Sequence, residues 1–508
     1  MRIIIICILI SVYQISICQT IITLQPDSAK YVINKNIYGH FAEHLGNSIY
    51  GGFYVGEKSS IPNTAGIRND VIAALRDLKI PNLRWPGGCF ADTYHWKDGI
   101  GPLKLRPSII NTNWGGTKED NSFGTNNFLN MCEILGAEPY ISGNVGSGSV
   151  QELADWVQYT NFSDGPMAKL RKEYGRSVPW NVKFWGIGNE AWGCGGNMTP
   201  EYYANEFRKY ASFMNSSPAA NLIKIASGAN SEDYNWTEVL MKNIPISMLG
   251  GLALHHYSVI DWNKKGAAAE FSELEYSISL KRALKMEELI TRHSAIMDKY
   301  DPAKNVALVV DEWGGWYNVE PGTNPGFLFQ QNTMRDAMIA GVTLNIFNNH
   351  CDRVKMANLA QTINVLQSVI LTHNESMILT PTYFVMQMYN VHQNADLIPS
   401  EITNMPYYKN GETSLPSISV SSSRKKDGSI NISIVNIDAS NSQTVEINGI
   451  KNAHSVTGKI LSSDHLQDHN SFTNAKKIAT KIFTNIKIQN NSIHIVIPAF
   501  SVIALHVN

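Results

Sequence analysis

The chain has 508 residues, too many for one ordinary domain and enough for a large core with a companion domain. Hydrophobic residues make up 44% and charged residues 17%, a balance typical of globular proteins and not of disordered ones. The formal net charge is −1 and the basic residues form no stripe, which argues against nucleic acid as a partner.

The first residues have the pattern of a signal peptide over positions 1–18. One basic residue, Arg2, precedes an apolar run over residues 3–12 that is too short to span a membrane. Small residues at the −3 and −1 positions predict cleavage before Gln19, and a lipid anchor on Cys18 is a minor alternative. No later segment has the apolar length of a membrane span. The sequence therefore predicts a secreted or periplasmic protein.

Between about residues 35 and 395, short apolar runs alternate with amphipathic helical patterns. We expect strands at residues 36–41, 80–85, 138–143, 182–187, 222–227, 252–256, 306–310 and 343–347. We expect helices at residues 69–78, 123–135, 150–159, 201–214, 277–300 and 327–340. Several strands are almost continuously apolar, as strands covered on both faces should be. The alternation predicts an α/β fold, a (β/α)₈ TIM barrel.

After about residue 396 the pattern changes to period-two alternation separated by clusters of Asn, Asp, Gly and Ser. The expected strands are 416–422, 429–437, 443–447, 477–488, 492–497 and 501–507. This is typical of an antiparallel β-sandwich or jelly roll. Residues 21–24, ahead of the barrel, are expected to add a strand to it. The predicted domains are therefore an N-terminal strand segment at 19–34, a barrel at 35–395 and a sandwich at 396–508.

Two carboxylates stand at the carboxyl ends of predicted barrel strands, where barrel enzymes place their chemistry. Glu190 follows the fourth strand in a Gly-Asn-Glu sequence, and Glu312 follows the seventh. Glycosidic bond cleavage requires two such groups: an acid for the leaving oxygen and a carboxylate for the oxocarbenium-like centre. One isolated Glu would more readily be explained by a structural salt bridge. The pair, with Asn189 beside one member, favours catalysis.

Other strand ends carry polar side chains that suit substrate binding. These are His40, Glu43 and His44 after the first strand, Arg84 after the second, Asn144 after the third, His255, His256 and Tyr257 after the sixth, and Gln361 after the eighth. The histidines match no metal motif, since the His-x-x-x-His at positions 40 and 44 lacks the adjacent Glu and lies at a strand end. We expect neither a catalytic metal nor a cofactor.

Four cysteines remain beyond the signal-like segment, and their spacing matches no zinc motif. Cys89 follows the second strand and Cys194 the fourth, so a barrel places both on the catalytic rim, next to glycines. Export would permit oxidation. Two interpretations stay open: a disulfide across the rim of the pocket, or two free, half-buried thiols without a special role.

With these residues in place, the chain resembles the family 51 glycoside hydrolases, the α-L-arabinofuranosidases of the retaining clan A. The resemblance extends from about residue 37 to the C-terminus. It rests on segments that follow the family's order: 37–46, 83–88, 119–124, 136–140, 188–190, 311–313 and 357–361. It implies a barrel with a β-sandwich built from both termini.

The resemblance also implies roles for individual residues. Glu190 would be the acid/base and Glu312 the nucleophile, with the two carboxyl groups about 5–5.5 Å apart as retention requires. Some members of the family carry Asn where this chain has Cys89, and the side chain of that Asn can form a hydrogen bond to the sugar. The residues that would hold the sugar or the catalytic carboxylates, or lie beside the sugar, are Glu43, Arg84, Cys89, Trp114, Asn189, His255, Tyr257 and Gln361.

The leading hypothesis is a retaining, exo-acting α-L-arabinofuranosidase that releases terminal arabinose from arabinan, arabinoxylan or their oligosaccharides. Another clan A specificity, such as xylosidase or endoglucanase activity, is the alternative among enzymes. A non-catalytic carbohydrate-binding barrel is the alternative from another class, although the presence of both glutamates argues against it. The expected partner is arabinose-containing plant polysaccharide or oligosaccharide, and a homo-oligomer stays open.

Overall fold

Eight parallel strands form a closed barrel in the computed structural model, which describes residues 19–450 and 455–508. The barrel strands are β2 (Gly39–Phe41), β5 (Asn82–Trp85), β8 (Glu138–Gly143), β9 (Phe184–Ile187), β10 (Ile223–Asn230), β11 (Gly251–Ser258), β12 (Ala307–Gly315) and β13 (Val354–Leu359). They neighbour one another in chain order, and β13 closes the barrel against β2. The predicted TIM barrel is confirmed.

Helices surround these strands. They are α1 (Asn69–Asp77), α2 (Thr125–Leu135), α3 (Val150–Asn161), α4 (Pro166–Glu173), α5 (Pro200–Phe213), α6 (Tyr234–Asn243), α7 (Glu273–Tyr300), α8 (Met334–Asn349) and α9 (Pro381–Tyr389). Several begin at a residue whose side chain accepts a backbone N–H of the first turn, as Ser149, Thr199 and Ser272 do. The sequence patterns did not predict α4, α6 or α9.

The predicted eighth strand at 343–347 is wrong. These residues lie inside α8, and the eighth strand is β13. Helix α8 packs between the barrel and the sandwich, so residues 334–348 are all buried. A helix covered on every side loses the alternation that marks an amphipathic helix and reads as one continuous apolar run. The helix expected at 327–340 begins seven residues later, at Met334.

Two sheets form the sandwich. One has the order β17-β1-β22-β26-β25 and the other β16-β20-β21-β27-β23-β24. Their strands are β1 (Thr20–Leu24), β16 (Asp396–Ile398), β17 (Ser400–Thr403), β20 (Ile418–Arg424), β21 (Ile430–Asn436), β22 (Gln443–Asn448), β23 (Val456–Leu461), β24 (Lys481–Ile482), β25 (Ile486–Gln489), β26 (Ser492–Ile497) and β27 (Ser501–Val507). The expected strand at 477–488 is two strands, β24 and β25. The N-terminal strand joins the sandwich as predicted.

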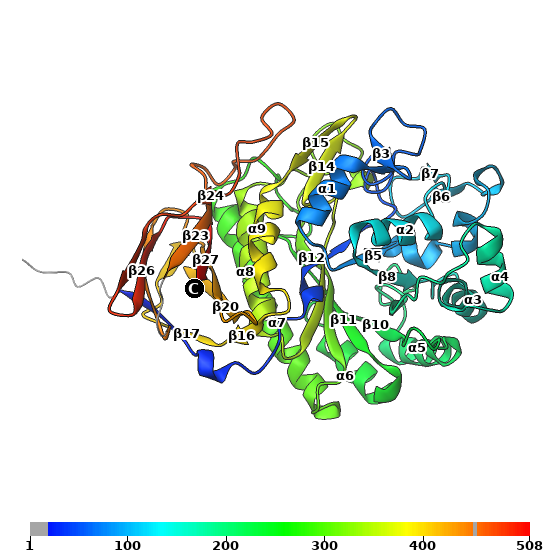
Figure 1. Ribbon diagram of the computed structural model, residues 1–508, viewed down its shortest axis with the longest axis horizontal. Helices are drawn as coiled ribbons and strands as arrows, with labels where there is room; N and C mark the ends of the chain where they lie inside the picture. The colour runs from blue at the N-terminus through cyan, green and yellow to red at the C-terminus, as the bar shows by residue number, and fades with distance from the viewer. Residues whose placement is uncertain (1–18, 451–454) are drawn as a thin grey trace, which may run out of the picture.

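The sandwich lies against one side of the barrel, with α8 and α9 between them (Figure 1). Three asparagines of α8 donate hydrogen bonds to β20: Asn345 to the Ser419 hydroxyl, Asn348 to the Ser421 hydroxyl, and Asn349 to the Val420 carbonyl. This places the sandwich far from the carboxyl ends of β5 and β9. Within the described ranges, no helix is long and apolar enough to cross a membrane.

Ile22→Ala should destabilise the protein, because Ile22 of β1 is fully buried in the sandwich core between Ile402 and Ile447. A loss of about 2–5 kcal/mol in the free energy of unfolding is expected from the cavity and the lost burial. Urea unfolding measures it. Ile21→Ala, on the half-buried neighbour, is the matched control and should cost less. Equal losses would contradict the role of β1 as a core strand.

Candidate active site

A small cavity of about 110 Å³ opens at the carboxyl ends of the barrel strands. Its walls are Glu43, Leu45, Gly88, Cys89, Trp114, Glu190, Tyr257, Glu312, Trp316, Leu328, Gln361 and Leu366. Both glutamates proposed for catalysis therefore face one cavity, as do Glu43, Cys89, Trp114, Tyr257 and Gln361. Arg84 and His255 lie just behind these walls, where they contact the carboxylates, and the Asn189 side chain accepts a hydrogen bond from Arg84.

The end of β12 is irregular, and this places two successive acids in the barrel mouth. Between Ala253 and His255 of β11 there is one residue, whereas their partners Val309 and Glu312 on β12 are separated by two. Such a bulge turns side chains that would otherwise alternate. Asp311 and Glu312 therefore both contact groups inside the barrel. Val309 packs in the apolar cluster inside the barrel, so regular alternation would place Asp311 inward and Glu312 outward, and the bulge brings Glu312 to the same side. Asp311 had no predicted role.

Glu312 accepts hydrogen bonds on both carboxylate oxygens. Arg84 donates from Nη1 to Oε1 at 2.8 Å, and the Tyr257 hydroxyl donates to Oε2 at 2.7 Å. The Nδ1 atom of His255 lies 3.6 Å from Oε2. These contacts fix the position of the Glu312 carboxyl group in the cavity.

His255 lies between two acidic groups, and each ring nitrogen faces one of them. Its Nδ1 is 2.9 Å from Oε1 of Glu190, and its Nε2 is 3.1 Å from Oδ1 of Asp311. Burial lowers the pKa of His255, but the charges of Glu312 and Asp311 outweigh it and raise this pKa to about 10. The ring is therefore an imidazolium that donates in both directions.

Glu190 has the surroundings of a group that holds a proton. Burial raises its pKa, the nearby charge of Glu312 raises it further, and the hydrogen bond from His255 opposes both. One carboxylate oxygen of Glu190 and one of Glu312 lie within 4.8 Å of each other. A raised pKa is what the role of general acid requires of Glu190.

Glu43 closes the opposite wall of the cavity. Its Oε1 accepts the Phe90 backbone N–H at 3.0 Å and the Trp114 indole N–H at 2.9 Å, and its Oε2 accepts the Gln361 amide at 3.0 Å. Burial, together with the charge of Glu312, raises the pKa of Glu43 to about 7. A Cβ at Gly88 would lie 2.6 Å from Glu43, so only glycine leaves room for this carboxyl group.

Gln361 and Trp114 present binding groups to the cavity. The Oε1 atom of Gln361 is buried and has no hydrogen-bond partner among the described residues, which leaves an acceptor for a hydroxyl group. Trp114 lies in the turn between β6 (Ile109–Asn111) and β7 (Thr117–Glu119), and this hairpin carries its ring to the cavity.

Glu190, His255 and Glu312 have ligand atoms close enough to one another to surround a metal ion. The protonation of His255 argues against that use, because an imidazolium has no free lone pair for a metal. A second close group contains Cys89, Glu190 and Cys194, but its two sulfurs are bonded to each other. The donor sets described here therefore fit proton and hydrogen-bond chemistry better than metal binding.

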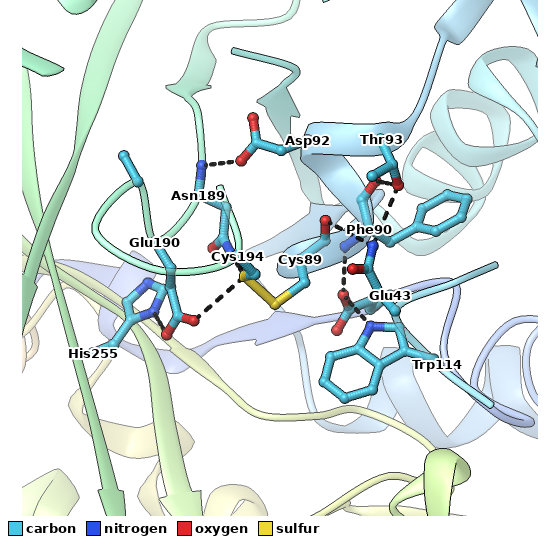
Figure 2. The surroundings of a disulfide bond; sticks show 12 residues. Glu43, Cys89, Phe90, Asp92, Thr93, Trp114, Asn189, Glu190, Cys194 and His255 are labelled. Carbon is cyan, nitrogen blue, oxygen red and sulfur yellow. Dashed lines mark hydrogen bonds and ion pairs between the residues drawn. A yellow bond between two sulfur atoms is a disulfide. The ribbon is translucent and has the colours of Figure 1, made fainter. Parts of the chain in front are cut away.

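Cys89 and Cys194 form a disulfide across the rim of the cavity, with their Cα atoms 5.5 Å apart (Figure 2). The predicted proximity is confirmed, and the alternative of two free thiols at these positions is wrong. The Sγ atom of Cys194 lies 3.7 Å from Oε2 of Glu190. Cys89 therefore lines the cavity with a bonded sulfur and has no thiol to offer a substrate.

His44, Asn144 and His256 have structural partners outside the cavity, whereas both ring nitrogens of His40 are buried without a hydrogen-bond partner among the described residues. His44 contacts Glu119 and accepts the Trp85 indole N–H, and Asn144 bonds the Ser147 hydroxyl. Sequence reasoning missed groups that support the site from behind, namely Asp92, Tyr140, Ser227 and Asp311. No local pattern marks them, because each acts on residues distant in sequence.

Comparisons with known proteins agree with this geometry. A family model described as "Alpha-L-arabinofuranosidase 1 domain" matches residues 74–268, and one described as "Alpha-L-arabinofuranosidase C-terminal domain" matches residues 311–501. An intracellular exo-α-L-arabinofuranosidase of Bacteroides ovatus is 50% identical over 487 residues, which covers 95% of each chain. The chain belongs to family 51 of the glycoside hydrolases.

Solved structures show the same relationship. The family 51 arabinofuranosidase from Xanthomonas axonopodis pv. citri superposes with a TM-score of 0.95 at 45% identity, covering 96% of this chain and 100% of that one. The α-L-arabinofuranosidase from Thermotoga maritima, solved as an arabinose complex, gives a TM-score of 0.82 at 28% identity and covers 96% of this chain and 99% of that one.

The predicted location of this family 51 protein needs correction. The Bacteroides ovatus relative is named intracellular, which contradicts a secreted or periplasmic protein with a signal peptide or a lipid anchor on Cys18. Residues 1–18 lie outside the described residues. The prediction rested on one basic residue and a short apolar run. This is a pattern of composition only, and it includes no residue whose chemistry requires export.

Cys194→Ser should destabilise this family 51 protein, because the bond closes a loop between residues 105 positions apart. A disulfide of this kind contributes about 2–4 kcal/mol to the free energy of unfolding. Peptide mapping of the unreduced protein should recover a linked pair of peptides containing Cys89 and Cys194. In thermal unfolding, a reductant should lower the Tm of the wild type and leave that of the variant unchanged. Free thiols at both positions would contradict the structure.

Proposed function

We propose that this protein is a retaining, exo-acting α-L-arabinofuranosidase that releases terminal arabinofuranose from arabinan, arabinoxylan or their oligosaccharides. Glu312 is the nucleophile and Glu190 the acid/base. The observation that carries the proposal is the separation of at most 4.8 Å between an oxygen of each carboxylate. Inverting enzymes need about 6.5–9.5 Å between the carboxyl groups to admit a water molecule, whereas retaining enzymes use about 5–5.5 Å.

The reaction proceeds by two displacements. Glu312, held by Arg84 and Tyr257, attacks the anomeric carbon while Glu190 gives its proton to the leaving oxygen. The glycosyl ester on Glu312 is then hydrolysed by a water molecule that Glu190 deprotonates. The names of the family 51 relatives from Bacteroides ovatus and Xanthomonas axonopodis support arabinofuranose as the sugar.

The cavity supports release of one sugar at a time. The cavity is small, about 110 Å³, and residues from the ends of several different barrel strands and from their loops surround it. Glu43, Trp114 and Gln361 close its wall opposite Glu190. Buried polar groups of this kind discriminate strongly against a sugar that lacks the matching hydroxyl.

We further propose that residues 35–395 are the catalytic domain and that residues 396–508, with 19–34, are its companion. The arrangement of the strands supports this division, because the cavity is lined from the barrel strand ends and their loops alone. The sandwich contacts the barrel through α8 and α9, on another side.

Hydrolysis of a panel of 4-nitrophenyl glycosides tests the proposed specificity. The α-L-arabinofuranoside should be cleaved far faster than the β-xyloside or β-glucoside, and linear arabinan should yield free arabinose as its first product. Product analysis by chromatography decides the second point. Oligosaccharides as first products, or preference for the xyloside, would favour the alternative specificities of the clan.

Substitution of the two glutamates should have different consequences. Glu312→Ala removes the nucleophile and should abolish turnover of every glycoside. Glu190→Ala should reduce activity on natural oligosaccharides by about 10²–10⁴-fold, because a poor leaving group needs a proton. An activated aryl glycoside needs little acid assistance, so its first step should survive and azide should restore the second. Steady-state kinetics on both substrate types, with and without azide, measures this.

Equal losses on both substrate types in Glu190→Ala, without azide rescue, would contradict the assignment of the acid/base. Glu190→Gln offers a matched comparison, since the amide retains the size of the side chain but has no proton to transfer.

A further inference from the structure

The backbone at Glu190 has an unusual conformation. Its φ is +39°, in the left-handed region that residues with a Cβ rarely adopt. A residue is held there only when its surroundings over-determine the conformation, and such residues cluster at active sites. The contacts on either side of Glu190 therefore decide where its carboxyl group lies.

Asp92 holds the backbone of Asn189, the residue before Glu190, through the Gly188–Asn189 peptide group. It belongs to the short helix η3 (Cys89–Thr93) after β5, and only 2% of its surface is exposed. Its Oδ2 accepts the Asn189 backbone N–H at 2.8 Å, and its Oδ1 accepts those of Val145 and Gly146 at 2.7 and 2.9 Å. Figure 2 shows this carboxylate directed at Asn189, away from the cavity. One buried side chain thus joins the loops after β8 and β9.

Ser227 holds the peptide group after Glu190. Its hydroxyl accepts the Ala191 backbone N–H at 3.0 Å. Ser227 is itself fixed, because its own backbone N–H donates to the Tyr203 hydroxyl at 2.6 Å, and that hydroxyl donates to the Ile187 carbonyl at the end of β9. The backbone N–H groups of the residues before and after Glu190 are therefore anchored by η3 and β10, respectively.

The loop that follows leaves little room for adjustment. The carbonyl oxygen of Glu190 accepts backbone N–H groups from Gly193 and Gly195, at 2.7 and 3.1 Å. A Cβ at position 195 would lie 1.8 Å from the Asn189 carbonyl oxygen and 2.8 Å from Asp92. The loop packs directly on the anchor, so a shift of Asp92 would move Glu190.

We infer that Asp92 and Ser227 are positioning residues, which fix the acid/base carboxyl of Glu190 by holding the backbone N–H groups of its two neighbours, Asn189 and Ala191. The inference rests on the proposed function. Neither residue lines the cavity, so neither touches the sugar. Their loss should act on proton transfer through Glu190 and spare the attack by Glu312, which is held by other residues.

The variants Asp92→Asn and Ser227→Ala test whether these two hydrogen bonds position Glu190. The Asn oxygen can keep the two bonds from Val145 and Gly146, in which case its NH₂ group faces the Asn189 N–H and breaks that one bond. Ser227→Ala removes a hydrogen bond without removing a charge. It therefore distinguishes an effect on the position of Glu190 from an effect of a lost charge on its pKa.

Two substrates distinguish the steps: 4-nitrophenyl α-L-arabinofuranoside, whose leaving group needs little protonation, and α-1,5-arabinobiose, whose leaving group needs it fully. In both variants kcat/KM for arabinobiose should fall by about 10-fold or more, and that for the aryl glycoside by less than about 3-fold. Azide should raise kcat of the variants on the aryl glycoside, because azide needs no base to attack the ester intermediate.

Asp438→Asn is the matched control. Asp438 is also a buried carboxylate that accepts two backbone N–H groups, from Ser440 and Asn441, but it follows β21 in the sandwich. It should change thermal stability without changing the ratio of activities on the two substrates. Equal losses on both substrates without an azide effect, or unchanged ratios in folded Asp92→Asn and Ser227→Ala, would overturn the inference.

If Asp92→Asn does not fold, Ser227→Ala decides the question by the same ratio. A wild-type protein that cleaves neither arabinofuranoside would refute the proposed function and the inference together. An active wild type with equal losses in the variants would refute the inference alone.

Discussion

The buried guanidinium of Arg84 is the constraint on which the rest of the site depends. A cation in the barrel interior is stable only when charges and acceptors surround it, because its hydration is lost. Arg84 contacts Ser142 from β8, Asn189 after β9, and both Asp311 and Glu312 from β12. Its rigid fork of donors fixes these groups relative to one another. The geometry of the nucleophile is therefore a consequence of compensating one buried charge.

Charge balance extends this constraint to the remaining carboxyl groups. The acidic pair on β12 offsets the charges of Arg84 and His255. Glu190 and Glu43 are buried beside Glu312, and burial and the charge of Glu312 raise the pKa of each. The acid/base of the proposed mechanism thus holds its proton because burial and this neighbouring charge outweigh the opposing effect of His255 and Arg84.

The sequence predicts most of the fold and the facing residues of the site, since apolar strand runs and the polar residues after them are local signals. It fails where the signal is not local. The run at 343–347 reads as a strand because α8 is covered on both sides. Glu312 faces the same side as Asp311 because of the β12 bulge, and Asp92 acts through Asn189, Val145 and Gly146, which are distant in sequence. The disulfide followed from barrel geometry, although the argument from export was wrong.

The same electrostatics explains how one glutamate serves as acid and then as base in the proposed mechanism. Before reaction, the charge of Glu312 raises the pKa of Glu190 and favours its protonated form. Ester formation neutralises Glu312, so this contribution disappears at the moment Glu190 has given up its proton. The imidazolium of His255 remains 2.9 Å away and favours the carboxylate that must now deprotonate water. The pKa of Glu190 therefore falls when its role changes, without any movement of the residues that hold it.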